Sequence, residues 1–115
     1  MQPAAQPDMT ARDSAIAAAL GRIPSGLFVV AWRDGGADRC MLASWIMQAG
    51  FAPPQISVAV ESSRDLLSAI DAGSTFTVNV LAESQRSLLA RFGKPSPEPL
   101  AGLEVLRAAS GAAVL

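Results

Sequence analysis

The order of apolar and polar residues predicts short helices and short strands rather than long elements of either kind. Apolar side chains recur at helical spacing over residues 10–20, with Thr10 at the capping position and Gly21 after the last turn. A run of β-branched and aromatic residues at 27–32 then predicts the first strand. Regular structure therefore begins with one helix followed by one strand.

A hairpin follows this first strand. Residues 33–38 form a polar turn that contains two glycines, and the apolar run at 40–46 predicts the return strand. Two consecutive prolines predict a loop over residues 48–54. Residues 55–60 then alternate apolar with small or polar side chains, which predicts a half-buried strand.

The second half of the chain mixes helices with strands. It predicts, in order, a helix that Ser62 or Ser63 caps and Gly73 closes, a strand at 75–81, a helix at 83–92, a proline-rich connection at 94–99, and short strands at 103–106 and 111–115. Short strands joined by hairpins and interposed helices predict a mainly β fold of the α+β type. Its expected form is a small antiparallel barrel with helices at its edge.

Length and charge narrow the class of protein. The chain has 115 residues, half of them hydrophobic, which suits one compact domain over residues 10–115 behind a loose tail at 1–9. The net charge is −1 and the basic residues are scattered, so nucleic acid and anionic membranes are disfavoured as partners. No apolar run has spanning length and no signal peptide is evident, so we expect a cytoplasmic protein.

The residue types that are missing limit the chemistry. There is no histidine, and Cys40 is the single cysteine, which excludes an internal disulfide, a zinc site of the usual ligand count and Ser-His or Cys-His catalysis. Cys40 is expected to be an inert small hydrophobe in a strand. Any reaction is then carried by a bound organic cofactor that the protein positions. We expect no metal ligand and no catalytic side chain.

Three places are candidates for ligand contacts. Residues 41–48 lie at the end of a strand, just before the two prolines. Backbone N–H groups left unpaired there would suit a planar ring or a phosphate. The alternative is that the apolar side chains of this segment simply pack in the core. Ser62, Ser63 and Arg64 open a helix and suit a phosphate, with a simple helix cap and a solvated arginine as the alternative. Asn79 in an apolar strand is either a satisfied buried amide or a ligand partner.

Six short motifs occur in order over most of the chain. They are Gly-Arg-Ile-Pro-Ser-Gly-Leu at 21–27, Met-Leu-Ala-Ser-Trp at 41–45, Gln-Ala-Gly-Phe-Ala-Pro-Pro at 48–54, Val-Ala-Val at 58–60 with Arg64, Phe-Thr-Val-Asn-Val-Leu at 76–81 and Arg-Phe-Gly-Lys-Pro at 91–95. Each is weak singly, but together they resemble the flavin reductase-like family with an FMN-binding split barrel. The version found as the C-terminal module of diflavin flavoproteins is the most similar in order and spacing.

The resemblance implies FMN, held noncovalently and commonly at a dimer interface. NADH or NADPH would reduce it, and the electrons would pass to an acceptor or a redox partner protein. By position, the resemblance implies that Ala43, Ser44 and Trp45 line the ring and the ribityl chain, and that Gln48, Ala49 and Gly50 approach the ribityl-phosphate. It implies that Ser62, Ser63 and Arg64 form the turn on the phosphate side, and that Asn79 lies on the strand beside the ring.

The resemblance also implies that the family domain continues past residues 111–115 with further strands and a histidine-bearing segment. We therefore expect an incomplete barrel whose unpaired strand edges and exposed apolar surface favour a homodimer. The leading hypothesis is a flavin reductase-like protein that transfers electrons from NAD(P)H through bound FMN. The alternatives are a non-catalytic flavin-binding or assembly domain without turnover, and a fragment without independent function.

Overall fold

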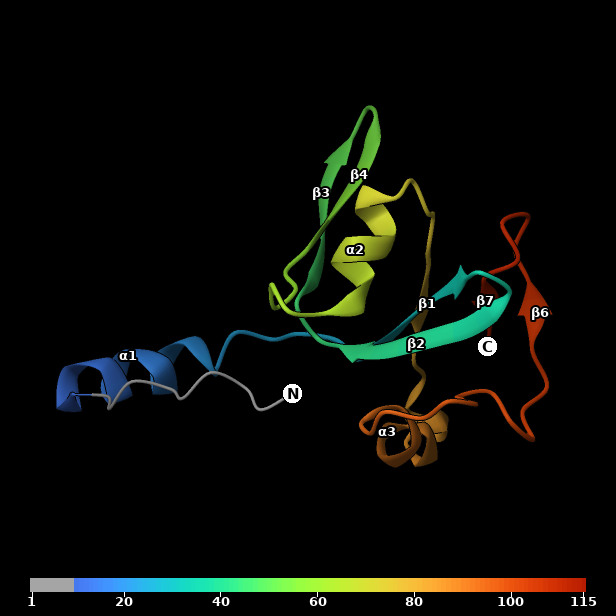
Figure 1. The fold of residues 1–115 in the computed structure, drawn as a ribbon. Coiled ribbons are helices and arrows are strands. Elements are labelled where there is room, and N and C mark those ends of the chain that lie inside the picture. Colours follow the sequence, from blue (N-terminus) through green and yellow to red (C-terminus); the bar gives the residue numbers. More distant parts are fainter. Residues whose placement is uncertain (1–9) are drawn as a thin grey trace.

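The computed structural model describes residues 10–115 as three small antiparallel sheets with short helices (Figure 1). The elements are, in chain order, α1 (Ala11–Leu20), β1 (Phe28–Asp34), β2 (Ala37–Ala43), β3 (Ile46–Phe51), β4 (Pro54–Val58), α2 (Asp65–Asp71), β5 (Thr77–Val80), the 3₁₀ turn η1 (Glu83–Gln85), α3 (Ser87–Phe92), β6 (Leu106–Arg107) and β7 (Ala113–Val114). The tail predicted at residues 1–9 lies outside the described residues. No helix between residues 10 and 115 is long and apolar enough to cross a lipid bilayer.

The largest sheet has the strand order β2-β1-β5, and both neighbouring pairs are antiparallel. The β1–β2 hairpin turns at Gly35 and Gly36, whose φ angles of 56° and 89° are those that a tight two-residue hairpin turn requires. Because β1 lies between two strands, its central residues are buried. β2 has one neighbour and forms an edge of this sheet.

The second sheet is the hairpin of β3 and β4, which projects away from the large sheet (Figure 1). Gln48 pairs with Ile56 and Gly50 with Gln55, so Ala49 is an extra residue that forms a bulge. The third sheet pairs β6 with β7 near the end of the described chain. These sheets are not closed into a barrel across residues 10–115, which agrees with the incomplete antiparallel fold that the sequence predicts.

The core has two parts because successive side chains of β1 point to opposite faces of the sheet. One buried cluster consists of Val29, Ala31, Phe92, Leu100 and Ala113. The other consists of Val30, Trp32, Met41 and Leu66. Accordingly α3 and β7 cover the first face, and α2 covers the second (Figure 1).

Helix α1 begins and ends where the sequence predicts but buries nothing. Thr10 accepts a hydrogen bond from the N–H of Asp13 at 3.1 Å, and Gly21 ends the helix. Every residue of α1 is exposed, and the helix extends away from the sheets (Figure 1). An isolated helix shorter than about 12 residues is only marginally stable in water. Tertiary packing against residues 10–115 therefore does not stabilise α1.

Several predicted boundaries are wrong. The predicted loop at residues 48–54 is mostly paired, because β3 runs to Phe51 and β4 starts at Pro54, whose missing N–H is harmless at the start of a strand. The predicted strand at 40–46 is broken after Ala43, where the chain passes from one sheet to the next. The predicted helix at 83–92 is a 3₁₀ turn followed by the short α3.

The start of α2 also differs from the prediction. Its N-cap is Arg64, with no side-chain capping bond, whereas Ser62 or Ser63 was the predicted cap. The hydroxyl of Ser63 donates instead to the Glu61 carboxylate at 3.1 Å. The sequence could not distinguish these outcomes, because a serine caps a helix only when the backbone brings its hydroxyl to the N2 or N3 amide.

Candidate functional site

The first group of predicted site residues lies where β2 passes into β3. Ala43 ends β2 opposite Phe28, and Ser44 and Trp45 connect the two sheets. The carbonyl of Trp45 accepts a hydrogen bond from the N–H of Ala59 at 2.9 Å, which fixes the base of the β3–β4 hairpin. The indole of Trp45 is 71% exposed and offers a flat apolar surface to a ligand or a second chain.

Ser44 offers unused hydrogen-bonding groups at this base. Between residues 10 and 115, neither its hydroxyl nor its backbone N–H donates to another protein group. Its position between two sheets matches the prediction that a strand end leaves backbone donors free for a ligand.

The second group, Gln48, Ala49 and Gly50, lies farther along β3, with Gln48 and Ala49 exposed. Gly50 sits beside the bulge, close to Gln55: a Cβ at Gly50 would lie 3.0 Å from the Gln55 Oε1. A larger residue there would push the Gln55 side chain aside, so the small residue keeps this part of the hairpin tightly packed.

The third group forms a tight turn between β4 and α2. The N–H of Arg64 donates to the Glu61 carbonyl at 3.0 Å, and the Ser63 hydroxyl donates to the Glu61 side chain. The Ser62 hydroxyl makes no hydrogen bond and the Arg64 guanidinium no ion pair with any residue from 10 to 115. An exposed hydroxyl and a guanidinium on one turn are a donor set that suits a phosphate.

Asn79 lies apart from these groups. It pairs with Val29, so its side chain points to the face of the sheet covered by α3 and β7, whereas α2 covers the opposite face. Its Nδ2 donates to the carbonyls of Val29 (3.1 Å) and Ala113 (3.3 Å), and its Oδ1 accepts from the Leu115 N–H (2.9 Å). These bonds favour the interpretation of Asn79 as a satisfied buried amide, and a flavin contact stays a prediction.

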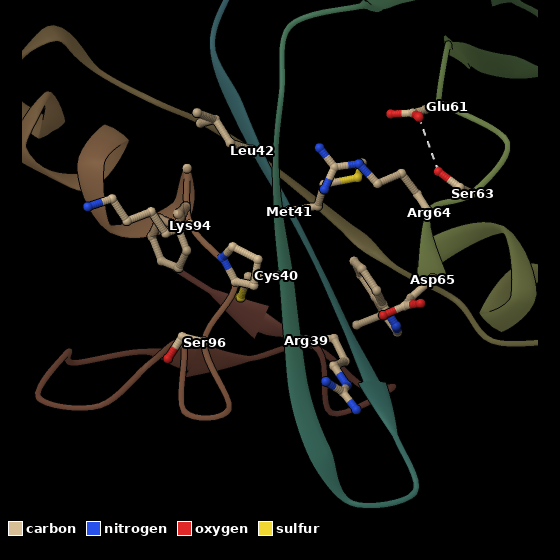
Figure 2. Close-up of a pocket in the computed structure, with 14 residues that line it drawn as sticks. Arg39, Cys40, Met41, Leu42, Glu61, Ser63, Arg64, Asp65, Lys94 and Ser96 are labelled. Atoms are coloured by element: carbon tan, nitrogen blue, oxygen red, sulfur yellow. Dashed lines mark hydrogen bonds between the residues drawn. The ribbon is translucent and has the colours of Figure 1, made fainter. Parts of the chain in front are cut away.

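A groove of about 550 Å³ runs along the edge of β2 (Figure 2). We call it the β2 groove. It is lined by Trp32, Arg39, Cys40, Met41, Leu42, Glu61, Ser63, Arg64, Asp65, Phe92, Gly93, Lys94, Pro95 and Ser96. Two of the ten predicted site residues, Ser63 and Arg64, line this groove.

Sequence reasoning missed the other two cations of the β2 groove, Arg39 and Lys94. Together with Arg64 they come from three distant segments: β2, the turn before α2 and the loop after α3. Figure 2 shows Arg64 on one side of the β2 ribbon and Lys94 on the other. No local motif joins them, so only the fold reveals that all three line one groove.

Two ionisable groups of β2 have shifted pKa values. Burial, helped by the charge of Asp38, raises the pKa of the Cys40 thiol to about 11. This agrees with the prediction of an inert thiol. The hydrogen bond from Arg107 is the main cause that lowers the pKa of Asp38, and Arg33 adds to it against a smaller opposing effect of burial. Asp38 thus joins the β1–β2 hairpin to β6 as a carboxylate.

The sequence was compared with known protein families and curated proteins. The model of the flavin reductase like domain matches residues 20–115. The chain belongs to the flavin reductase-like family. A relative from Synechocystis sp., diflavin flavoprotein A 1, is 36% identical over 107 residues, which are 90% of this chain and 19% of that protein. Another from Thermosynechococcus vestitus, putative diflavin flavoprotein A 1, is 35% identical over 111 residues, covering 93% of this chain and 19% of the relative.

Solved structures show the same fold at lower identity. Nitrilotriacetate monooxygenase component B from Mycobacterium thermoresistibile has a TM-score of 0.79 and 22% identity, covering 90% of this chain and 57% of that one. An NADH:FAD oxidoreductase from Streptomyces globisporus has a TM-score of 0.78 and 22% identity, and the match covers 96% of this chain and 68% of that one. The fold is thus the split barrel of flavin reductases. The chain spans about a fifth of the length of the curated relatives above.

Proposed function

We propose that this flavin reductase-like domain binds FMN and transfers electrons from NADH or NADPH to an acceptor, which includes a redox partner protein. The family match over residues 20–115 carries the proposal. The proposal places the protein in the cytoplasm, where pyridine nucleotides are available as donors.

The residues of this chain fit a flavin phosphate and ring at the base of the hairpin. Ser62 and Arg64 offer a hydroxyl without a hydrogen bond and a guanidinium without an ion pair to residues 10–115, which suit a dianionic phosphate. Ser44 offers an unused hydroxyl and N–H, which suit the polar edge of a ring or a ribityl hydroxyl. The exposed indole of Trp45 supplies an apolar surface beside them.

The composition indicates which part of the reaction the protein side chains perform and which part a flavin performs. When bound, a flavin supplies the hydride and electron chemistry. The chain has no histidine and no tyrosine, so its own contribution is to bind, orient and exclude water through serine, arginine and backbone groups. No side chain at the hairpin base is assigned a proton-transfer step.

The proposal includes a homodimer, because the β3–β4 hairpin leaves several large apolar side chains exposed. The exposed apolar side chains of the hairpin are Trp45 (71%), Met47 (66%), Phe51 (84%) and Ile56 (52%). Large exposed apolar side chains on both faces of a projecting two-stranded hairpin are typical of a surface that another chain covers. A second copy would supply the missing wall of the flavin site.

The test is a titration of the purified protein with FMN, FAD and riboflavin, followed by flavin fluorescence. We expect FMN to bind and riboflavin, which lacks the phosphate, to bind more weakly. Arg64→Gln should weaken FMN binding about 10- to 100-fold, because it removes a hydrogen bond to a charged group, and leave riboflavin unchanged. Arg12→Gln on the exposed helix α1 is the matched control and should change neither affinity.

Turnover is measured separately as oxidation of NADH and NADPH by the FMN-loaded protein with an excess of free flavin as acceptor. A protein that binds no flavin contradicts the proposal. Tight FMN binding without NAD(P)H oxidation supports the non-catalytic flavin-binding alternative instead. Equal loss of FMN and riboflavin in Arg64→Gln shows that Arg64 does not contact the phosphate.

A further inference from the structure

The edge of β2 is an unpaired strand edge inside a groove. β2 pairs with β1 on one side and with no other strand between residues 10 and 115. In an edge strand every second residue directs its N–H and C=O away from the sheet. Arg39, Cys40, Met41 and Leu42 of this strand all line the β2 groove, so the outward backbone groups face its hollow.

The side chains around this edge differ from a plain solvent-exposed surface. Arg39 pairs with Trp32 and shares its face, and Arg64 lies on that same side of β2, whereas Lys94 lies on the other (Figure 2). Apolar Trp32 and Phe92 line the hollow on the two faces. A strand laid along β2 would therefore meet a cation on each face, beside the largely buried rings of Trp32 and Phe92.

The cations of the β2 groove are weakly engaged within the protein. Arg64 and Lys94 form no ion pair with residues 10–115, and Arg39 reaches Asp34 only at 3.9 Å, with both groups exposed. Two acidic residues, Glu61 and Asp65, also line the groove, and Glu61 already accepts the Ser63 hydroxyl. In the flavin-free chain the groove thus has one net positive charge, with Arg39, Arg64 and Lys94 set against Glu61 and Asp65, and its free backbone donors lie at the strand edge.

We propose that the edge of β2 binds an extended acidic segment of a partner protein as an added strand. Backbone pairing with β2 would supply affinity, and Arg39 and Lys94 would select carboxylates that project to the two faces. A small anion would use the cations but leave the strand edge unpaired. An extended chain uses both features, which is why we favour it.

The probe is a fluorescein-labelled eight-residue peptide that alternates glutamate with valine, titrated with the full chain and followed by fluorescence anisotropy. We expect saturable binding that weakens as salt rises. The same peptide with lysine in place of glutamate should bind at least tenfold more weakly. Two further peptides carry N-methyl groups on the valine or on the glutamate amides, and at least one of them should lose binding, because methylation blocks strand pairing.

The protein variants are Lys94→Glu and the double variant Arg39→Glu with Lys94→Glu. Reversal of an exposed charge should weaken the acidic peptide about fivefold for the single variant and more for the double variant. Lys94 lies in a loop outside β2, so Lys94→Glu should fold normally. This single variant therefore tests the proposal even if the double variant does not fold. Arg64 stays unchanged because the flavin proposal uses it, and Arg12→Glu on α1 is the control.

The outcomes separate clearly. Absence of acidic-peptide binding overturns the proposal and leaves Arg39 and Lys94 as charges that shield the strand edge from aggregation. Binding of both methylated peptides as tightly as the unmethylated peptide also overturns it, because the contact is then electrostatic without strand pairing. Loss of acidic-peptide binding in Lys94→Glu but not in Arg12→Glu supports it.

Discussion

The N–H of Leu115 donates to the Oδ1 of Asn79 over 2.9 Å, and the other end of the same amide donates to the Val29 carbonyl at 3.1 Å. A third bond joins Asn79 to the carbonyl of Ala113, and the Thr77 hydroxyl donates to that carbonyl at 2.7 Å. One buried amide therefore fastens β7 to the central sheet, across a sequence separation of 34 residues or more.

We predict that Asn79→Ala lowers the free energy of unfolding by about 2–3 kcal/mol, because buried backbone groups lose their partners. Asn79→Asp should be at least as damaging, since a carboxylate would face two carbonyl oxygens. Urea denaturation followed by circular dichroism measures both. The control is Val80→Thr on the same strand, where the side chain is 73% exposed. A change below about 0.5 kcal/mol for Asn79→Ala would contradict a structural role.

The same variant separates the two interpretations of Asn79. If the amide is structural, folded Asn79→Ala protein at low temperature should bind FMN with nearly the affinity of the unaltered chain. Flavin fluorescence titration measures this. A loss of tenfold or more in FMN affinity, with the fold intact, would instead support the contact that the family resemblance implies.

Asp38 should make stability depend on pH. Its pKa is lowered in the folded chain, chiefly by Arg107, so the unfolded state binds its proton more readily. The stabilisation is present above the unfolded pKa of about 3.9 and is lost as the pH falls through the lower folded pKa. We expect Asp38→Asn to cost about 1 kcal/mol of unfolding free energy at pH 7 and progressively less as the pH falls below about 3.9.

The matched control for this pH effect is Asp34→Asn in the same hairpin. Asp34 is mostly exposed and its contact with Arg39 is 3.9 Å long, so its replacement should change stability little at any pH. Urea midpoints between pH 3 and pH 7 give both profiles. A cost for Asp38→Asn that is the same at both ends of this range would contradict the ion-pair explanation.

Cys40 should be slow to alkylate in the folded chain. With its pKa raised to about 11 by burial, about one thiol in ten thousand is ionised at pH 7. We expect iodoacetamide to react much faster in urea than in buffer, and the folded rate to keep rising above pH 9. Mass spectrometry follows the reaction cleanly because the chain has one cysteine. Rapid labelling of the folded protein at pH 7 would show an activated thiol.

Local patterns predicted most elements well but not where one sheet gives way to the next. Thr10 and Gly21 mark α1 by local chemistry, and the glycine turn marks the first hairpin, so both were predictable. The break after Ala43 was not, because residues 40–46 are continuously apolar and the change of sheet depends on what they pack against. The two prolines predict a loop at Pro54, whereas the structure begins a strand there, a position that proline tolerates.

The candidate site divides in the same way. Ser62, Ser63 and Arg64 are neighbours in sequence, so their shared turn was predictable. The family resemblance implies that Asn79 lies on the strand beside the flavin ring, but the sequence does not show which face of the sheet its side chain occupies. Only the fold brings Arg39 and Lys94 to one groove, and no spacing rule joins residues so far apart.

The proposed homodimer predicts a specific response to charge on the β3–β4 hairpin. Phe51 is 84% and Met47 is 66% exposed, so replacing either by glutamate should leave the stability of one chain nearly unchanged. The same charge buried between two copies would be costly, so Phe51→Glu and Met47→Glu should shift the protein from dimer to monomer. Sedimentation velocity measures the shift. Leu106→Glu, at a 73% exposed site on β6, is the control and should leave the dimer intact.

FMN affinity supplies the second readout of this experiment, because the proposal gives the second copy a wall of the flavin site. The monomeric Phe51→Glu and Met47→Glu chains should bind FMN more weakly at the same protein concentration, although neither change removes a hydrogen bond to the flavin. Raising the concentration should restore dimer and affinity together. A monomeric unaltered chain, or monomeric variants with full FMN affinity, would contradict a site shared between two copies.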